Sequence, residues 1–184
     1  MLNLDHNRPF MGFGKIPRLF RDIVITEKLD GTNAQIVIND EGTEIVAIGS
    51  RNRHISPGDD NYGFAKWVEA NQEELLKLGP GHHFGEWWGQ GIQRNYGLKE
   101  KRFSLFNVGR WGATTLPSIC HVVPTMYQGH FSVTWIEAAL DDLRTNGSKA
   151  APGFMKPEGI IVYHEQGRNL YKVTCEDDHK PKGL

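Results

Sequence analysis

The sequence has little cysteine and no long apolar run. Its two cysteines, Cys120 and Cys175, stand 55 positions apart and form no Cys-x-x-Cys pair. This excludes a disulfide framework and a cysteine zinc site, and a reducing cytoplasm is the expected location. No apolar stretch approaches the roughly 20 residues of a membrane helix. The polar, proline-broken N-terminus does not resemble a signal peptide, so we expect no membrane association.

The sequence also has no excess of either charge. Lysine and arginine total 21 against 22 aspartates and glutamates, which gives a net charge of -1. A strongly basic nucleic-acid coat protein is excluded, although a local basic groove is not. The 184 residues suffice for one domain with a buried core. We expect a single domain over 1–184, with an irregular lead-in over 1–15 and a polar tail over 176–184.

Short apolar and β-branched runs predict a protein of many short strands. The predicted strands are Asp22–Glu27, Ala34–Asn39, Thr43–Ile48, His83–Trp88, Phe103–Val108, Gly159–Tyr163 and Asn169–Thr174. The second and third form a hairpin around a turn at residues 40–42, and the last two form another pair. No regular alternation of strands and helices is present. The pattern therefore predicts an α+β domain of largely antiparallel sheets with flanking helices.

Two segments have helical spacing of their apolar residues. One covers Asn61–Leu78 and ends at a Gly-Pro-Gly sequence. The other covers Ser132–Arg144, with a capping box formed by Thr134 and Glu137, and Gly147 follows its end.

Lys28 stands at the end of an apolar strand, in the sequence Thr-Glu-Lys-Leu-Asp-Gly-Thr-Asn. A lysine directly after a buried strand is partly desolvated, which disfavours its charged form and makes the amine a better nucleophile. Asp30 alternates onto the same face, and Gly31 allows the backbone to turn sharply near a ligand. Taken alone, this pattern favours a surface lysine paired with Asp30 over a nucleophile.

Other charged side chains lie beside apolar strands. Arg51 and Arg53 follow a strand in a loop that suits either phosphate contacts or solvent. Glu86 lies among three aromatic residues and two glycines, where a carboxylate is costly without a metal or a hydrogen-bonding partner. Glu158 repeats this pattern at the start of a strand, and Lys172 lies within the last strand.

Several aromatic residues and histidines have two interpretations. Phe106 belongs either to the core or to a surface that stacks on a purine. Trp67 and Trp135 have helical spacing and are expected in the core. His82 and His83 are adjacent in a predicted strand, so they point to opposite faces, and surface placement is favoured over a metal pair.

Together these segments resemble, in order along the chain, the motifs of the covalent nucleotidyltransferase superfamily of polynucleotide ligases and mRNA capping enzymes. The similar segments are Lys28–Gly31, Arg51, Phe84–Glu86, Phe103–Asn107, Glu158–Gly159 and Lys172. Glu27-Lys28, Gly31–Asn33 and Gly91–Asn95 resemble the RNA ligase 2-like branch. The resemblance covers about 16–174. It implies a ligase-type nucleotidyltransferase domain without an OB domain.

The resemblance also implies ATP-dependent RNA ligation in three steps. Lys28 Nζ attacks the α-phosphorus of ATP, releases pyrophosphate and becomes a lysyl-adenylate. The AMP then passes to a 5′-phosphate end, and a 3′-hydroxyl displaces it. Phosphoryl transfer of this kind needs charge neutralisation and in-line positioning more than acid–base catalysis. The implied substrates are a nicked duplex or broken RNA strand ends.

The same resemblance implies roles for individual residues. Arg51 and Lys172 neutralise the α-phosphate, Phe106 stacks on the adenine, Glu27 lies near its amino edge and Glu86 near the ribose. Mg²⁺ or Mn²⁺ is held by Asp30, Glu86 or Glu158, directly or through water. The implied catalytic residues are Lys28, Asp30, Glu158 and Lys172. The implied ATP-binding residues are Glu27, Lys28, Asn33, Arg51, Glu86, Phe106, Glu158 and Lys172.

The sequence departs from the family pattern in three places. Thr174 stands where a second lysine is usual, so Lys172 acts alone or Arg53 or Lys149 replaces the missing cation. Asn107 stands where an acidic residue is common. About ten residues follow Thr174, so we expect no C-terminal OB or helical domain, and a partner protein is one possible source of such a domain.

Other functions remain open at this point. In the same class are a DNA-nick ligase, a stand-alone adenylyltransferase and a guanylyltransferase. In a different class is a non-catalytic nucleotide- or RNA-binding module. A basic segment contacts either a phosphate backbone or water, and it consists of Arg94, Lys99, Lys101 and Arg102.

Overall fold

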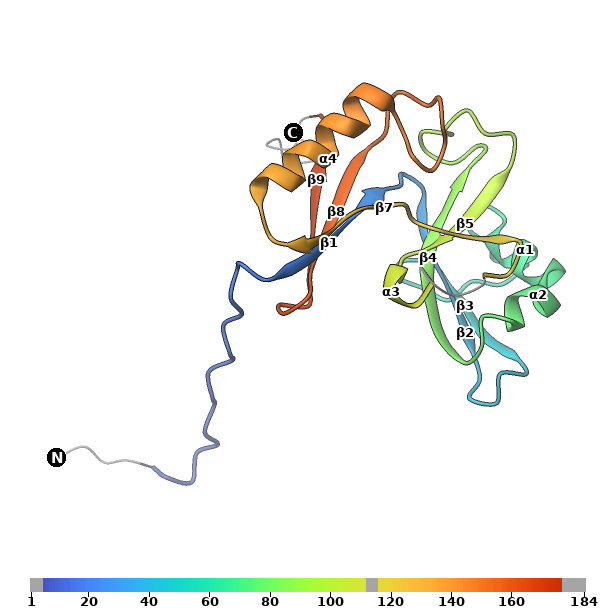
Figure 1. Ribbon diagram of the computed structural model, residues 1–184. Helices are drawn as coiled ribbons and strands as arrows, with labels where there is room; N and C mark the ends of the chain where they lie inside the picture. The colour runs from blue at the N-terminus through green and yellow to red at the C-terminus, as the bar shows by residue number, and fades with distance from the viewer. Residues whose placement is uncertain (1–4, 112–115, 177–184) are drawn as a thin grey trace.

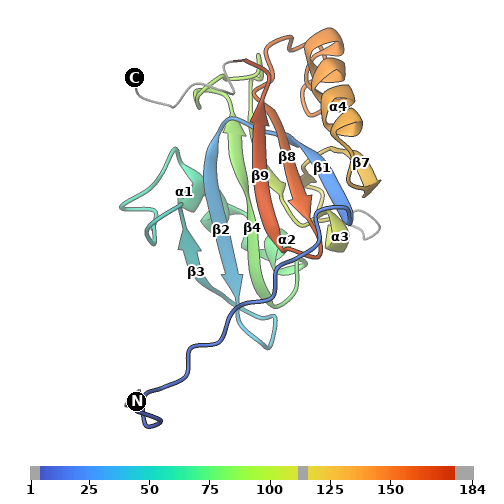
Figure 2. The same ribbon diagram turned by 90° about the vertical axis from the view of Figure 1, so that its left-hand side faces the viewer.

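A computed structural model of the chain describes residues 5–111 and 116–176. Two β-sheets face each other in this part of the chain (Figures 1 and 2). The four-stranded sheet has the order β7 (Thr125–His130), β1 (Asp22–Lys28), β8 (Gly159–His164) and β9 (Asn169–Thr174). The five-stranded sheet has the order β3 (Ile45–Gly49), β2 (Thr32–Ile38), β4 (Gly81–Gly89), β5 (Lys101–Leu105) and β6 (Cys120–Val122).

Helices cover the outer face of each sheet: α1 (Phe64–Ala70) and α2 (Gln72–Leu76) on the five-stranded sheet, and α4 (Val133–Asn146) on the four-stranded sheet. The short helix α3 (Val108–Trp111) follows β5 and borders the space between the sheets. All strand pairs are antiparallel except β5 with β6. The predicted α+β class with largely antiparallel sheets is therefore confirmed.

Each sheet buries its outer face and turns the other toward its partner sheet. In β1, Ile23 and Ile25 pack with Leu140 and Leu143 of α4. In β2, alternate residues pack against α1 and α2 in a larger core that contains Phe64. Because side chains alternate across a strand, the intervening residues of each sheet point into the space between the sheets. That space contains the candidate site.

A third apolar cluster joins the two sheets. It contains Leu29, just after β1, and Val123, between β6 and β7, together with Trp88, Tyr96 and Ala151. Leu29 and Val123 both lie in segments that cross from one sheet to the other, so this cluster fixes the sheets against each other.

The structure corrects the first predicted helix. Residues 61–78 form two short helices, α1 and α2, separated at Asn71. The Asn71 side chain donates a hydrogen bond to the carbonyl of Trp67 at 2.7 Å, and its backbone leaves helical geometry. A short amide that bonds a nearby backbone carbonyl competes with helix propagation.

The second helix is confirmed, but its predicted capping box is wrong. The N-cap is Ser132, whose hydroxyl accepts from the backbone N–H of Thr134. Gly147 ends the helix as expected, with φ of 78°. Trp135 is 48% exposed and stacks on Tyr127 rather than entering the core. The stripe of α4 that packs on the sheet comprises the buried Ala139, Leu140 and Leu143 and the partly buried Ile136, and Trp135 lies outside this stripe.

The strand predictions are confirmed within one or two residues in most cases, and the 34–48 hairpin and the last strand pair are present. The predicted strand Phe103–Val108 ends at Leu105, because Val108 begins α3. β6, β7 and α3 were not predicted.

Residues 5–20 form no helix or strand. Most of the predicted polar tail, 177–184, lies outside the described residues. Among the described residues, no helix has the length and apolar character needed to cross a bilayer.

Gly85, in the centre of β4, has no space for a side chain. A Cβ there would lie 2.5 Å from the Ser104 carbonyl oxygen and 2.6 Å from a ring carbon of Phe103. We therefore expect Gly85→Ala to lower the free energy of unfolding by about 1–3 kcal/mol through overpacking, measured by urea denaturation. The matched control is Gly58→Ala, whose Cβ would have no neighbour within 4 Å. Equal stability of the two variants would contradict this close packing.

Candidate active site

A cleft of about 690 Å³ lies between the inner faces of the two sheets. Its volume is in the usual range for small-molecule sites. The cleft-lining residues of the four-stranded sheet include Val24, Thr26, Lys28, Gln128, Ile161, Tyr163, Leu170 and Lys172. Those from the five-stranded sheet and its loops include Asn33, Arg51, His82, Phe84, Glu86 and Phe106. Residues from widely separated parts of the sequence therefore meet in one cavity.

Lys28 is held by Glu158. Its Nζ lies 2.5 Å from Glu158 Oε2, and the Glu158 side chain is almost fully buried while that of Lys28 is partly exposed. β1 and β8 bring them together, because Lys28 is paired in register with Gly159, the residue after Glu158. The pairing of Lys28 with Asp30, which the local sequence favours, is wrong.

Asp30 instead pairs with Arg94. Arg94 Nε donates to Asp30 Oδ2 at 2.9 Å, and its Nη1 donates to the carbonyl of Lys156. Asp30 is not among the cleft-lining residues, so this carboxylate serves a contact between loops. Lys101 and Arg102 also bond within the fold, to the carbonyl of Tyr62 and to Glu100. Three of the four cations in the basic segment thus have partners inside the chain.

Glu86 is a buried carboxylate on the cleft face of β4. Its oxygens accept hydrogen bonds from the Gly31 N–H at 3.0 Å and from Asn33 Nδ2 at 3.3 Å. Asn33 Oδ1 in turn accepts from Arg51 Nε at 2.8 Å. Burial raises the pKa of Glu86 to about 7, although the Gly31 N–H and Lys28 oppose this shift. Glu86, Asn33 and Arg51 therefore form one connected polar wall.

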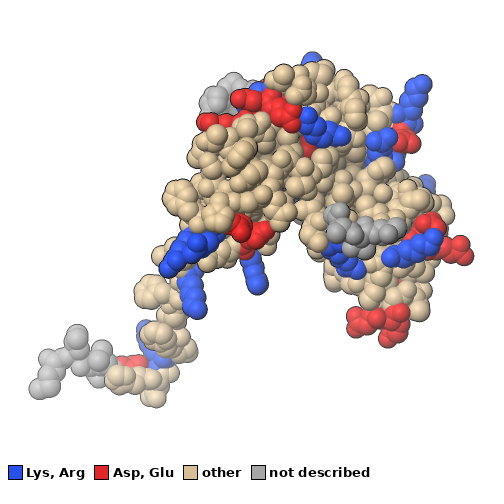
Figure 3. All heavy atoms as spheres, in the orientation of Figure 1, with Lys and Arg blue, Asp and Glu red and all other residues tan. Residues whose placement is uncertain are grey.

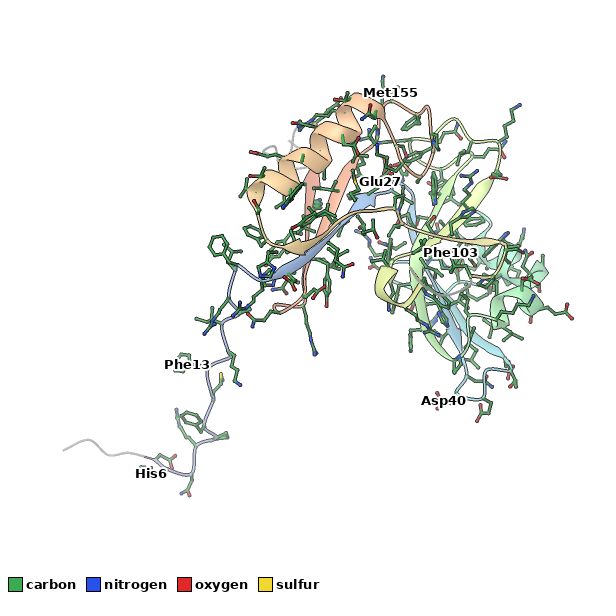
Figure 4. The ribbon with its side chains drawn as sticks, viewed as in Figure 1. His6, Phe13, Glu27, Asp40, Phe103 and Met155 are labelled. Atoms are coloured by element: carbon green, nitrogen blue, oxygen red, sulfur yellow. The ribbon has the colours of Figure 1, made fainter. Side chains whose placement is uncertain are left out.

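Glu27 borders the cleft, but its carboxylate is directed elsewhere. It accepts hydrogen bonds from Ser148 Oγ at 2.5 Å and from the N–H groups of Lys149 and Ala150 at 2.8 and 2.9 Å. The side chain is fully buried, and this burial raises its pKa. Figure 4 shows Glu27 at the end of β1, beside the cleft. The expected contact of Glu27 with an adenine has no support here, because its oxygens already hold the 148–150 segment.

Exposed aromatic rings lie on the cleft face of the five-stranded sheet. Phe106 is 41% exposed and Phe84 is 53% exposed, and the Phe106 N–H donates to the Phe84 carbonyl. The ring of His82 stacks on Phe84 with centroids 5.8 Å apart. His83 faces the opposite side, is buried and bonds the Gly79 carbonyl. Surface placement was therefore correct for His82 and wrong for His83, whose pKa burial lowers.

The strand register places Lys28 and Lys172 in neighbouring rows of paired residues across the four-stranded sheet. Thr26, Ile161 and Lys172 form one row across β1, β8 and β9, and Lys28, Gly159 and Thr174 form the next. Lys172 therefore projects into the cleft, one row from Lys28. Thr174, at the position where the family usually has a second lysine, lies in the same row as Lys28, with Gly159 between them.

Neither candidate for the missing cation lines the cleft. Arg53 pairs with Asp59 at 2.5 Å, and Lys149 pairs with Asp142 at 2.8 Å. The expectation that one of them replaces the second lysine has no support in this geometry.

The sequence interpretation missed several residues of the cleft. They include Gln128, Tyr163, Leu170, Phe84 and Arg110. The alternation of each strand could have found Tyr163 and Leu170, because they stand two residues from Ile161 and Lys172. Arg110 has no comparable signal, since it comes from α3, which was not predicted.

The carboxylates fit a divalent metal only in part. Among the described residues, no group of three or more His, Cys, Asp or Glu side chains is placed to hold a metal. Glu86 lines the cleft and Glu158 contacts the cleft residue Lys28, whereas Asp30 is paired with Arg94. Mg²⁺ and Mn²⁺ are commonly held by one or two carboxylates together with substrate phosphates and water. The residues present therefore fit a metal that arrives with a nucleotide.

Solved structures with this fold come from the RNA ligase of Naegleria gruberi. One variant with AMP and Mn gives a TM-score of 0.63 at 21% identity, covering 85% of this chain and 50% of that chain. A variant without ligand gives 0.62 at 21% identity, with coverages of 85% and 50%. A variant with ATP and Mn gives 0.60 at 20% identity, with coverages of 86% and 51%. The chain thus spans about half the length of these ligases and has an RNA ligase-type nucleotidyltransferase fold.

The sequence supports the same class of protein. The family model described as RNA ligase matches residues 21–174, which include both sheets and the whole cleft. The chain belongs to the RNA ligase family. A comparison with curated proteins finds no match.

The raised pKa of Glu86 predicts a pH-dependent stability. Between the ordinary pKa of about 4.5 and about 7, the folded protein binds more protons than the unfolded chain, so this contribution is lost as the pH rises. The substitution Glu86→Gln removes this titrating group and with it the pH-dependent contribution to the free energy of unfolding. Between pH 4.5 and pH 8, we expect the wild type to lose up to about 3 kcal/mol more unfolding free energy than the variant.

The measurement is urea denaturation across that pH range. Glu137→Gln, at an exposed position of α4, is the matched control and should follow the wild type. Parallel curves for the wild type and Glu86→Gln would contradict the raised pKa.

Proposed function

We propose that this chain forms a covalent lysyl-AMP at Lys28 and uses it to join the 5′-phosphate and 3′-hydroxyl ends of RNA. The observation that carries this proposal is the convergence of Lys28, Arg51, Glu86, Phe106 and Lys172 on one cleft between two sheets. Membership of the RNA ligase family supports RNA as the substrate, and the presence of ATP or AMP with Mn in structures of similar fold supports the nucleotide and the metal.

In the first step, Lys28 Nζ attacks the α-phosphorus of ATP. A P–N bond forms, the bond to pyrophosphate breaks, and the amine loses a proton. Glu158 Oε2, 2.5 Å from Nζ, is positioned to accept that proton. The partial exposure of Lys28 in the cleft allows the nucleotide to reach it.

Cations in the cleft neutralise the phosphate during this step. Lys172 lies one row from Lys28, and Arg51 lies on the opposite wall, so the α-phosphate fits between them. Arg51 is oriented by its bond to Asn33. Mg²⁺ or Mn²⁺, held by Glu86 or Glu158, would polarise the phosphate and neutralise the charge of the leaving pyrophosphate.

The five-stranded sheet binds the nucleoside. The exposed ring of Phe106 offers a stacking surface for adenine, and such stacking contributes about 1–3 kcal/mol per base. Glu86 and Asn33, on the same face, provide an acceptor and a donor for the ribose hydroxyls.

In the later steps, the 5′-phosphate of an RNA end takes AMP from Lys28, and a 3′-hydroxyl then displaces AMP to form the phosphodiester. This chemistry suits the repair of nicked duplexes or broken RNA ends. We place the chain in the RNA ligase 2-like branch on its Glu27-Lys28, Gly31–Asn33 and Gly91–Asn95 segments. Its two cysteines are unpaired, which suits a reducing cytoplasm.

The test of the first step is labelling with ATP carrying ³²P at the α-phosphate, in Mg²⁺ or Mn²⁺, followed by denaturing electrophoresis. The protein is first treated with pyrophosphate to remove any bound AMP. We expect label on the wild type and on the control Lys66→Ala, an exposed lysine of α1, and at least a hundredfold less on Lys28→Ala, because the nucleophile itself is lost.

Other outcomes separate the rival functions. An unlabelled wild type, with no mass increase of about 329 Da for a lysyl-AMP, would indicate a non-catalytic binding module. Labelling by GTP alone would indicate a guanylyltransferase. Once the lysyl-AMP is established, nicked duplexes with RNA or DNA at the 3′-hydroxyl side test the substrate, and sealing of DNA alone would contradict RNA ligation.

A further inference from the structure

Residues 6–21, here called the N-terminal arm, precede β1, and the part before Arg18 extends away from both sheets (Figures 1 and 4). The arm carries large apolar side chains that are mostly exposed, namely Phe10, Met11, Phe13, Ile16, Leu19 and Phe20. Phe10 is 91% exposed, and Phe13 is fully exposed. So many uncovered apolar side chains in one short segment mark an interaction surface.

The charge of the arm differs from that of the remaining chain. The arm contains Arg8, Lys15, Arg18 and Arg21 and no aspartate or glutamate. Its formal charge is therefore +4 in a protein with a net charge of -1. Figure 3 shows lysine and arginine side chains gathered where the arm leaves the body of the molecule. This composition fits a polyanionic partner.

At two places in the arm, a cation and an aromatic ring stand two residues apart. Arg8 stands two residues before Phe10, and Phe13 stands two residues before Lys15. In an extended chain, residues two apart point to the same side, roughly 7 Å from each other. Each such pair presents a cation and a ring to the same side, where the cation can contact a phosphate and the ring can stack on the base of one nucleotide. Single-stranded nucleic acids are bound in this way, by cations along the backbone and aromatic rings under the bases.

Prolines and glycines in the arm disfavour a helix or a strand there. Pro9 and Pro17 lack the N–H that helices and sheet ladders need, and Gly12 and Gly14 disfavour a helix. This sequence disfavours the amphipathic helix with which a basic, apolar segment lies on a membrane.

Residues 18–20, where the arm joins the four-stranded sheet, are fixed beside the cleft. The Arg18 N–H donates to Gln166 Oε1 at 2.8 Å, and the Leu19 carbonyl bonds the ring of His164 at 2.9 Å. Phe20 packs edge-on against Phe131. His164 and Gln166 belong to the β8–β9 hairpin, whose inner face lines the cleft. The nine Cα–Cα steps from Leu19 to Phe10 span at most roughly 30 Å when extended.

We propose that the N-terminal arm holds a single-stranded RNA end next to the cleft, with Arg8 and Lys15 on phosphates and Phe10 and Phe13 stacked on bases. The inference rests on the proposed function for its substrate class, and it adds the surface that binds the strand. The arm joins β1 at the end where Ile23 pairs with His164, and Lys28 lies at the other end, where it pairs with Gly159. An RNA strand held by the arm therefore has to run along the cleft to bring its end to the lysyl-AMP.

The test is the fluorescence anisotropy of a 5′-phosphorylated single-stranded RNA bound by the full chain without ATP. We expect Phe10→Ala with Phe13→Ala to weaken binding at least about thirtyfold, because each of the two lost stacks removes about 1–3 kcal/mol. We expect Arg8→Gln with Lys15→Gln to reduce the slope of log affinity against log salt by about 1.4, since each phosphate contact to a single strand contributes about 0.7. The matched control, Lys66→Gln with Lys77→Gln, removes two exposed cations outside both the arm and the basic segment and should bind as the wild type.

The same variants separate this inference from the proposed function. All of them should form the lysyl-AMP as the wild type does, because the arm lies outside the cleft. Loss of RNA binding in the arm variants supports the inference even if ATP labelling fails. Unchanged RNA affinity in both arm variants, or no RNA binding by the wild type, would overturn it.

Two other partners are also tested by these variants. If sedimentation shows that they turn a dimer into a monomer without loss of RNA affinity, the arm binds a second copy. If they lose binding only to anionic phospholipid vesicles, the arm binds a membrane surface. Either result would overturn the inference.

Discussion

A buried carboxylate and a lysine amine meet between the two sheets, where Glu158 lies against Lys28. A buried carboxylate without a partner is destabilising. The relative positions of β1 and β8 and the charge of the cleft therefore depend on this contact. The register that pairs Lys28 with Gly159 brings Glu158 beside the lysine. The polar wall of Glu86, Asn33 and Arg51 then faces this pair from the other sheet. In the proposed reaction, the Lys28 amine leaves the carboxylate of Glu158 and bonds to the phosphate of the nucleotide instead.

The two-sheet architecture explains how so small a chain builds a polar cleft. Alternate residues of each strand point to opposite faces of its sheet. Residues on the outer face make apolar contacts with helices, and residues on the inner face provide polar or aromatic groups to the cleft. Ile23 and Ile25 of β1 belong to the first group, and Thr26 and Lys28 belong to the second. The apolar cluster around Leu29 fixes the two sheets against each other, so their facing groups are held at a constant separation.

Local patterns in the sequence predicted much of the fold and the identity of the main cleft residues. Strand alternation and short motifs led to Lys28, Arg51 and Phe106, all of which line the cleft. The partners were not predictable, because they come from distant segments: Arg94 pairs with Asp30, and residues 148–150 bind Glu27. The helix break at Asn71 and the exposure of Trp135 also follow from tertiary contacts that a local pattern does not contain.

The bonds of Glu27 have a consequence for the motion of its neighbour. Glu27 is fixed to the 148–150 segment by three hydrogen bonds, and Leu29 is buried in the cluster between the sheets. The backbone of Lys28 is therefore clamped on both sides. In the proposed lysyl-AMP, the nucleotide therefore moves by rotation about the bonds of the lysine side chain and about those that join its nitrogen to the phosphate. The RNA end that receives the AMP has to be brought within the length of that side chain.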